Sequence, residues 1–244
     1  MARKLRPGVR VAIWSVAALT AGALAASFIW EWRTPERPAL GPPPAGLPTR
    51  IEAVAGDGHR GVRDGARSEA RFEDPFGIAV AADGTAFVAD GGASNRIRRV
   101  WPDGRVDTFA GSLEGFVDGR GGDARFHTPS GLALDAVGAL YVADTGNHAI
   151  RRIAPDGTVT TLAGTGEAGF VDGPAAQARF HAPTGVAVDA TGRVYVADGF
   201  NDRIRVIEAG TVRTLAGDGR PGFVDGIGAQ ARFDTPGGLA LGDD

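Results

Sequence analysis

Short apolar runs separated by turn-forming residues repeat three times along the chain, at about residues 76–111, 130–164 and 184–217. Each repeat holds four runs: the first follows a P-x-G sequence, the second ends in V-A-D, the third alternates basic with aliphatic residues, and the fourth ends in Ala-Gly. Asp-Gly pairs, as at 83–84 and 156–157, favour two-residue hairpin turns. Four antiparallel strands without a helix predict one blade of a β-propeller, so the expected fold class is all-β.

The sequence A-R-F occurs four times and is followed each time by a proline and a glycine. Its phenylalanines follow one another at steps of 54, 54 and 53 residues, at Phe72, Phe126, Phe180 and Phe233. A period this regular indicates one structural module per repeat. Such a module buries its apolar face only against its neighbours, so we expect the blades to pack side by side about a common axis.

The pattern P-x-G-[ILV]-A-[VL], V-A-D, N and I-R-x-[IV] resembles the NHL repeat, with Asn95, Asn147 and Asn201 at the asparagine position. The resemblance covers residues 50–244. It implies a six-bladed propeller of the kind used mostly as an interaction platform, with enzyme relatives among amidating lyases and lactonase-like hydrolases. An insert after the fourth run, A-G-x-G-x-x-G-[FV]-x-D-G, makes each unit longer than the common repeat of about 42 residues.

The count of runs predicts an incomplete propeller in residues 50–244, with about three complete blades and part-blades at both ends. Residues 50–56 match a fourth run alone, and residue 244 comes just after a first run. A propeller closes when its terminal strands complete one blade. We therefore expect a fragment of a larger propeller, or, as the alternative, open arcs from two or more chains that join into a ring.

The N-terminal segment combines a basic cluster at residues 1–10 with an uncharged apolar run at residues 11–30. About twenty helical residues span the hydrocarbon core of a bilayer, and basic residues favour the cytoplasmic side. The pattern predicts a cytoplasmic N-terminus, a transmembrane signal anchor, and a propeller in the periplasm or outside the cell. A signal peptide cleaved after Ala23-Leu24-Ala25 and a buried helix are the alternatives.

Residues 31–49 are rich in proline, which favours extended polyproline geometry over helix or central strand. We interpret this segment as a semi-rigid linker between the membrane and the propeller. The alternative is a docking ligand for a proline-recognising domain.

An aspartate precedes the arginine of every A-R-F sequence by seven residues. We expect the two side chains to form an ion pair that stabilises the crossing between blades, and a repeated anion or cation site is the alternative. The expected pairs are Asp64 with Arg71, Asp118 with Arg125, Asp172 with Arg179, and Asp225 with Arg232. The V-A-D aspartates, Asp90, Asp144 and Asp198, are expected to accept hydrogen bonds from turn backbone, together with their asparagine partners.

The residue after each A-R-F differs between copies and is therefore the best place for ligand or metal chemistry. The candidates are Glu73, His127, His181 and Asp234. If this position lines the axis, four such groups converge there. The resemblance to amidating lyases implies histidines from separate blades that hold a metal near the axis. The alternative places these side chains at the rim, where they accept hydrogen bonds from loops. His59 and His148 have no equivalents and are expected to be exposed.

Composition narrows the function further. A net charge of −3 is too small to suggest a nucleic-acid partner, and the lack of cysteine excludes disulfides and thiolate chemistry. No catalytic residue and no cofactor are predicted. The sequence thus predicts a membrane-tethered propeller that binds a protein, peptide or glycan on one face. The alternative is a lyase or lactonase-type hydrolase with a divalent metal, such as zinc or calcium, in the central channel.

Overall fold

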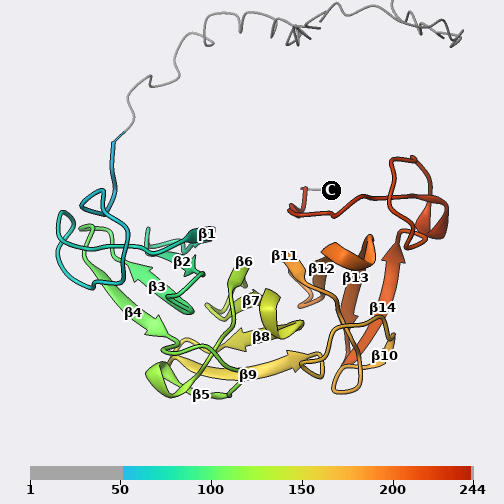
Figure 1. The fold of residues 1–244 in the computed structure, drawn as a ribbon, viewed down its shortest axis with the longest axis horizontal. Coiled ribbons are helices and arrows are strands. Elements are labelled where there is room, and N and C mark those ends of the chain that lie inside the picture. The colour runs from blue at the N-terminus through green and yellow to red at the C-terminus, as the bar shows by residue number, and fades with distance from the viewer. Residues whose placement is uncertain (1–51, 243–244) are drawn as a thin grey trace, which may run out of the picture. The chain divides into compact units, whose positions relative to one another are not determined.

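Three antiparallel sheets follow one another around an arc in the computed structural model, which describes residues 52–242 (Figure 1). The first sheet contains β1 (Pro75–Val80), β2 (Ala86–Asp90), β3 (Arg96–Val100) and β4 (Val106–Ala110). The second contains β6 (Pro129–Leu134), β7 (Leu140–Asp144), β8 (Ala149–Ile153), β9 (Thr158–Ala163) and β5 (Gly119–Arg120). The third contains β11 (Pro183–Val188), β12 (Val194–Asp198), β13 (Arg203–Glu208), β14 (Thr211–Ala216) and β10 (Gly173–Pro174).

The only helices in the described part of the chain are four short 3₁₀ turns. They are η1 (Gly121–Asp123), η2 (Thr145–Asn147), η3 (Gly199–Asn201) and η4 (Gly228–Gln230). Among residues 52–242, no helix has the length and apolar character needed to cross a membrane. The predicted cytoplasmic segment 1–10, the anchor 11–30 and the linker 31–49 lie outside the described residues.

The hairpins within each sheet have the predicted turn chemistry. Asp83 accepts a hydrogen bond from the Thr85 N–H at 2.9 Å, and Gly84 has a φ of +87° that a β-carbon would strain. Asp156 and Gly157 repeat this arrangement in the second sheet. The four predicted strands of each repeat are therefore found in chain order, with β1, β6 and β11 on the inner side of the arc.

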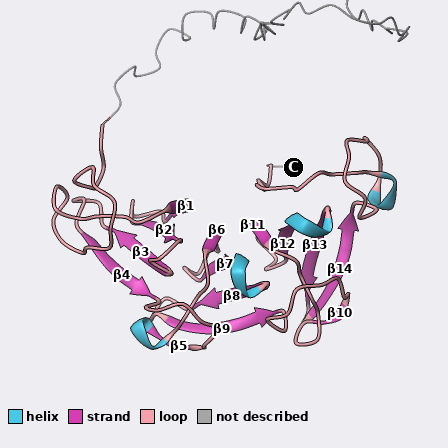
Figure 2. Ribbon diagram, viewed as in Figure 1, coloured by secondary structure: helices cyan, strands magenta, loops and turns pink. Residues whose placement is uncertain are grey.

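The sequence did not reveal a fifth strand, which the insert contributes to the following sheet. After β4, the chain crosses to the second sheet and β5 pairs with the outer strand β9, placing Gly119 opposite Val159. In the same way β10 pairs with β14 in the third sheet, as Figure 2 shows. In the first sheet a single bridge between Gly65 and Val106 takes this place. Each insert thus joins the outer edge of the blade that comes after it.

Two of the apolar cores in the described residues lie between neighbouring sheets, and a third lies between the first sheet and the segment that precedes it. Phe87 and Ile97 of the first sheet pack with Leu140 and Val142 of the second, around the fully buried Phe126. An equivalent core joins the second and third sheets around Phe180, the next phenylalanine of the A-R-F series. This packing explains why the repeat period is so regular, because every blade must present the same apolar shape to its neighbour.

One arginine on the third strand of each blade is fully buried and forms the centre of a polar network. In the second blade, Arg151 donates to the Asp144 carboxylate at 2.7 Å and to the Asp118 carboxylate at 2.6 Å. The same guanidinium donates to the carbonyl oxygens of Val117 at 2.9 Å and Arg125 at 3.1 Å. Arg98 and Arg205 occupy the equivalent positions, and each binds two carboxylates as well; a planar fork of donors suits this arrangement.

For three of the four insert aspartates, the predicted pairing with the nearby A-R-F arginine is replaced by a pairing with the buried third-strand arginine of the blade that the insert joins. The observed partners are Asp64 with Arg98, Asp118 with Arg151, and Asp172 with Arg205. The A-R-F arginines pair elsewhere: Arg71 with Asp57, Arg179 with Glu167, and Arg232 with Asp218. The reason is backbone alternation: in an extended segment the alanine and phenylalanine of A-R-F point inward, so the arginine between them points to solvent. No described residue forms an ion pair with Arg125 or Asp225.

The V-A-D aspartates accept hydrogen bonds from backbone as expected. Asp144, which is fully buried, accepts the N–H of His127 at 2.8 Å, and Asn147 donates to its other oxygen at 2.8 Å. Burial raises the pKa of the Asp144 carboxyl, while Asn147 and Arg151 act to lower it. Asp198 has the same surroundings in the third blade.

The alignment of Asn95 with the other two asparagines is shifted by one residue. Counted back from the buried arginine, Ser94 is the equivalent of Asn147, and Asn95 is the equivalent of His148. Backbone geometry agrees, since Asn95 and His148 both have left-handed φ values, of 50° and 51°. The extra residue in the β2–β3 turn of the first blade caused the shift.

Replacing Arg151 by methionine tests the importance of the buried network. Arg151→Met leaves the Asp144 carboxylate buried without its cation, and we expect the free energy of unfolding to fall by about 3–5 kcal/mol. Arg152→Met is the matched control, because Arg152 is its half-buried neighbour on β8 and has no ion-pair partner among the described residues. Urea denaturation of both variants checks this, and equal losses would show that the network adds nothing beyond ordinary packing.

Candidate functional site

The inner strands of the three blades approach each other closely because each carries the glycine of P-x-G. A β-carbon on Gly131 would lie 2.5 Å from the carbonyl oxygen of Thr184 and 2.8 Å from the Cα of Gly185. A β-carbon on Gly185 would lie 2.5 Å from the carbonyl oxygen of Gly237. The repeated glycine therefore allows β6 and β11 to lie against one another on the inner side of the arc.

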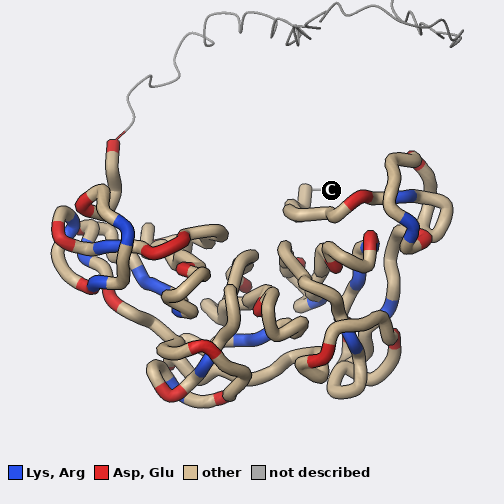
Figure 3. Tube along the Cα trace, in the orientation of Figure 1, with Lys and Arg blue, Asp and Glu red and all other residues tan. Residues whose placement is uncertain are grey.

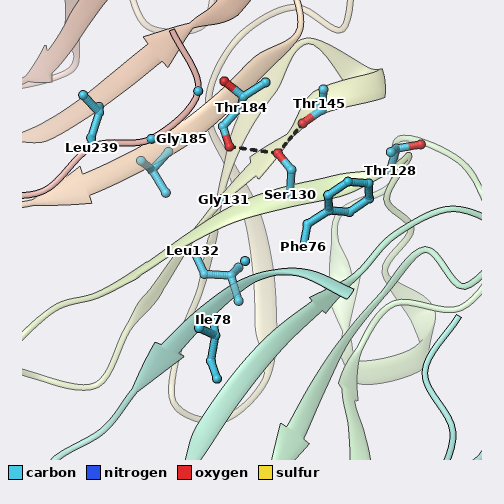
Figure 4. Close-up of a pocket in the computed structure, with 14 residues that line it drawn as sticks. Phe76, Ile78, Thr128, Ser130, Gly131, Leu132, Thr145, Thr184, Gly185 and Leu239 are labelled. Carbon is cyan, nitrogen blue, oxygen red and sulfur yellow. Dashed lines mark hydrogen bonds between the residues drawn. The ribbon is translucent and has the colours of Figure 1, made fainter. Parts of the chain in front are cut away.

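These inner strands line an open groove with a volume of about 430 Å³, which we call the axial groove. Its wall is formed by glycine backbone, apolar side chains and hydroxyls, as Figure 4 shows. The side chains that line it are Phe76, Ile78, Leu132, Val186, Leu239, Thr128, Ser130, Thr145 and Thr184. None of its lining residues is charged, in agreement with the uncharged sequences of β1, β6 and β11 (Figure 3).

The hydroxyls of the groove form hydrogen bonds across the blade junctions. Ser130 donates to the carbonyl oxygen of Thr184 at 2.9 Å, and its Oγ lies 2.5 Å from that of Thr145. Thr145 in turn donates to the carbonyl oxygen of Pro183 at 2.7 Å. These bonds hold the wall in place and leave an apolar surface in which Phe76, 57% exposed, is the largest side chain.

The four candidates that follow A-R-F do not line this groove. The backbone N–H groups of Glu73, His127 and His181 are held by the buried V-A-D aspartates of their own blades, which places them in the linkers that lead into the inner strands. Asp234 is exposed, and its carboxylate accepts the hydroxyl of Thr235 at 3.2 Å. The four positions are equivalent in the repeat, and none of them is among the residues that line the axial groove.

Each candidate side chain has local contacts instead. Glu73 forms an ion pair with Arg60 at 2.9 Å, and the Nε2 of His127 lies 3.7 Å from Glu114. The ring of His181 lies 5.1 Å from that of Phe200. Within residues 52–242, no group of three or more His, Asp or Glu side chains is placed to hold a metal ion.

His148 was expected to be exposed, but it is partly buried at the junction between the second and third blades. Its Nδ1 accepts a hydrogen bond from the Ala182 N–H at 3.1 Å. Asn95 accepts from the Thr128 N–H at 2.8 Å at the preceding junction, and Asp202 accepts from the Thr235 N–H at 2.8 Å at the following one. In each blade, one side-chain acceptor in the turn between the second and third strands thus binds the segment that leads into the next inner strand. Only an alignment that starts from the buried arginine could have revealed that these three residues are equivalent. His59, by contrast, is largely exposed as expected.

Burial lowers the pKa of His148, and the nearby His181 and His127 lower it further, while Asp198 opposes them. The ring of His181 lies 5.7 Å from that of His148 at the junction between the second and third blades. The neutral form is also the form that the hydrogen bond needs, since a protonated Nδ1 carries a hydrogen and cannot accept one.

The repeated antiparallel blades, the cores between them and the inner groove define the class of the protein: it is a β-propeller-like repeat protein. The family model described as "NHL repeat" matches residues 126–153 and 180–207. Each match begins at an A-R-F phenylalanine and ends at the last or next-to-last residue of the third strand of the blade. The chain belongs to the NHL-repeat family.

Similar proteins include NHL repeat-containing protein 2 of Gallus gallus. It is 36% identical over 173 residues, which make up 64% of this chain and 24% of the relative. Protein SUPPRESSOR OF QUENCHING 1, chloroplastic, of Arabidopsis thaliana is 34% identical over 148 residues, 56% of this chain and 14% of the relative. The chain thus spans a quarter or less of these two relatives. A solved structure, an auxiliary nutrient binding protein from Bacteroides thetaiotaomicron, is similar in fold, with a TM-score of 0.55, 21% identity, and coverage of 69% of this chain and 43% of that one.

The junction at His148 predicts a pH-dependent stability. Because the folded state holds this histidine at a lowered pKa, the unfolded chain takes up its proton first as the pH falls below 6.5, the ordinary histidine value. The free energy of unfolding therefore decreases as the pH is lowered through that range. His148→Asn supplies a non-titrating acceptor like Asn95 at the equivalent position. For this variant we expect the free energy of unfolding to decrease less steeply with falling pH, as measured by urea denaturation between about pH 8 and about pH 5. Parallel profiles for the two proteins would exclude a contribution from His148.

Proposed function

We propose that this protein is a membrane-tethered NHL-repeat propeller that acts outside the cytoplasm as a binding scaffold. Its ligand is an uncharged segment of a protein, peptide or glycan, held in the axial groove. The observation that carries this proposal is the groove itself, an apolar wall with hydroxyl and backbone polar groups and no charged side chain.

The chemistry of the wall favours this class of ligand. A charged group entering the groove would lose water without gaining an ionic partner from the wall, which is unfavourable. Exposed Phe76 and Ile78 instead offer apolar contact area. The volume of about 430 Å³ falls within the range that small ligands and short segments occupy in other proteins.

The tether is proposed from the sequence alone. Four basic residues precede the apolar run 11–30, and a proline-rich segment separates that run from the propeller. This order suits an uncleaved anchor with the propeller on the far side of the membrane. N-terminal sequencing of the mature protein checks it: an intact N-terminus in the membrane fraction supports the anchor, and a mature chain that begins at Ala26 contradicts it.

Binding in the axial groove is tested by a surface variant that leaves the fold intact. The purified full chain is screened against peptide and glycan arrays, and the dissociation constant of the strongest ligand is measured by calorimetry. We expect Phe76→Ser to weaken binding about tenfold, since loss of a partly buried aromatic contact is worth about 1.4 kcal/mol or more.

Val137→Ser is the control, because Val137 is 76% exposed in the β6–β7 turn and does not line the groove. Equal affinities for the wild type and Phe76→Ser would place the ligand elsewhere. Chemical turnover of the bound ligand by the purified protein would contradict a scaffold function.

A further inference from the structure

The second and fourth positions of each P-x-G-x sequence both line the axial groove. They lie two residues apart on an inner strand, and side chains with this spacing share a face. The fourth position is aliphatic in every copy, at Ile78, Leu132, Val186 and Leu239. The second position differs between copies, with Phe76, Ser130, Thr184 and Gly237. The chemistry of the groove therefore changes from blade to blade at the second position.

Ser130 and Thr145 use both of their hydroxyl hydrogens within the protein. Ser130 donates to the carbonyl oxygen of Thr184, and Thr145 donates to that of Pro183. A further hydrogen bond of 2.5 Å joins the two hydroxyl oxygens. Two hydrogens thus serve three contacts, and none remains for a ligand. Each hydroxyl oxygen has two lone pairs, and the bond between the two oxygens occupies only one of the four.

Thr184 has the same character on the next blade. Its hydroxyl donates to the carbonyl oxygen of Pro236 at 2.9 Å, so its hydrogen is also occupied, and no hydrogen bond from residues 52–242 ends on its oxygen. We call Ser130, Thr145 and Thr184 the hydroxyl cluster; all three are partly exposed. Thr128, the fourth hydroxyl of the groove, lies apart from this cluster (Figure 4).

The hydroxyl cluster can accept hydrogen bonds from a ligand, but it can donate one only by breaking a bond that holds the wall. A ligand that presents only acceptors to the cluster would lose its bonds to water and gain none. Phe76 adds an exposed aromatic ring to the same groove, and the negative face of such a ring attracts polarised C–H groups. A well-matched ligand therefore combines hydrogen-bond donors with an apolar face.

We propose that the ligand of the axial groove is a neutral glycan whose hydroxyls donate to the hydroxyl cluster while a sugar ring lies against Phe76. This inference rests on the proposed binding function of the groove and names its ligand class. Sugar hydroxyls rotate to direct their hydrogen at an acceptor, and adjacent hydroxyls of one ring can reach the neighbouring oxygens of Ser130 and Thr145. None of the lining residues is charged, which disfavours acidic and amino sugars.

A peptide matches the hydroxyl cluster less well than a glycan does. Its backbone carries one carbonyl for each N–H, and the planar peptide bond fixes the direction of both groups. An extended segment would therefore bring carbonyl oxygens against the lone pairs of the cluster, where no hydrogen is left to satisfy them. A sugar hydroxyl avoids this conflict, because it can donate to the protein and accept from water at the same time.

The test starts from an array of neutral oligosaccharides probed with the purified full chain. The glycan that binds most tightly is then made as a series in which fluorine replaces one hydroxyl at a time, which removes a donor with little change in size. We expect the dissociation constant, measured by calorimetry, to rise about tenfold for at least one fluorinated glycan, since a hydrogen bond to the cluster is lost.

The chain variant Thr184→Val removes one acceptor of the cluster with little change in shape. We expect it to weaken binding about tenfold, and to make one of the damaging fluorine substitutions cost nothing further, because both changes remove the same hydrogen bond. Thr184→Ser keeps the hydroxyl and should bind like the wild type. Thr160→Val is the matched control, because Thr160 is an exposed threonine on the outer strand β9 and does not line the groove.

The glycan assignment is overturned if no neutral glycan binds, or if no fluorine substitution weakens binding. Losses that add for Thr184→Val and every fluorinated glycan would overturn the role of the hydroxyl cluster. A peptide that binds more tightly than any glycan, and that Phe76→Ser weakens, would overturn the glycan and leave the groove as the binding site. Equal affinities of the wild type and Phe76→Ser for the best ligand would instead contradict the proposed function itself.

Discussion

The fold depends on an arginine that each blade buries between two carboxylates from different parts of the chain. In the second blade, Asp144 comes from the adjacent strand and Asp118 from the insert, so one guanidinium fixes a strand, a turn and a crossing segment. A buried charge is tolerated only when it is paired and hydrogen-bonded, and here two carboxylates and two carbonyls bind the Nη atoms of Arg151, while its Nε is buried without a partner. That requirement fixes the path of the insert as firmly as the apolar core does, and it explains why the insert sequence varies so little between repeats.

Blades, turns and the side-by-side packing were predictable because they depend on local patterns with a short period. Ion-pair partners were not, because Asp118 and Arg125 are close in sequence but lie on two segments that the turn η1 separates, while the observed partner Arg151 lies 33 residues from Asp118. A single added residue in the first β2–β3 turn hid the equivalence of Asn95 and His148. In both cases the deciding contact joins residues 33 or 34 positions apart, which is beyond the range of the local patterns that predict strands and turns.

The candidate site, like the fold, was only partly predictable from the sequence. The glycine of P-x-G was visible in the sequence, but its role in bringing neighbouring inner strands together depends on how the blades meet. The four variable positions after A-R-F attracted attention by their chemistry, yet the backbone N–H groups of three of them are bound by the V-A-D aspartates, and none of the four lines the groove. The wall of the groove is built instead from residues with unremarkable sequence signals, such as Ser130 and Thr145.

The edge strand contributed by each insert puts the structural unit out of phase with the sequence repeat. A blade cut out at its first inner strand, at Pro129 for example, would lose β5 and the carboxylate of Asp118 together. A transferable blade therefore starts upstream of that strand, near residue 112, and ends with β9 at Ala163. Duplication or exchange of blades during evolution would have preserved the fold most easily when the crossover points fell at the Ala-Gly ends of the outer strands.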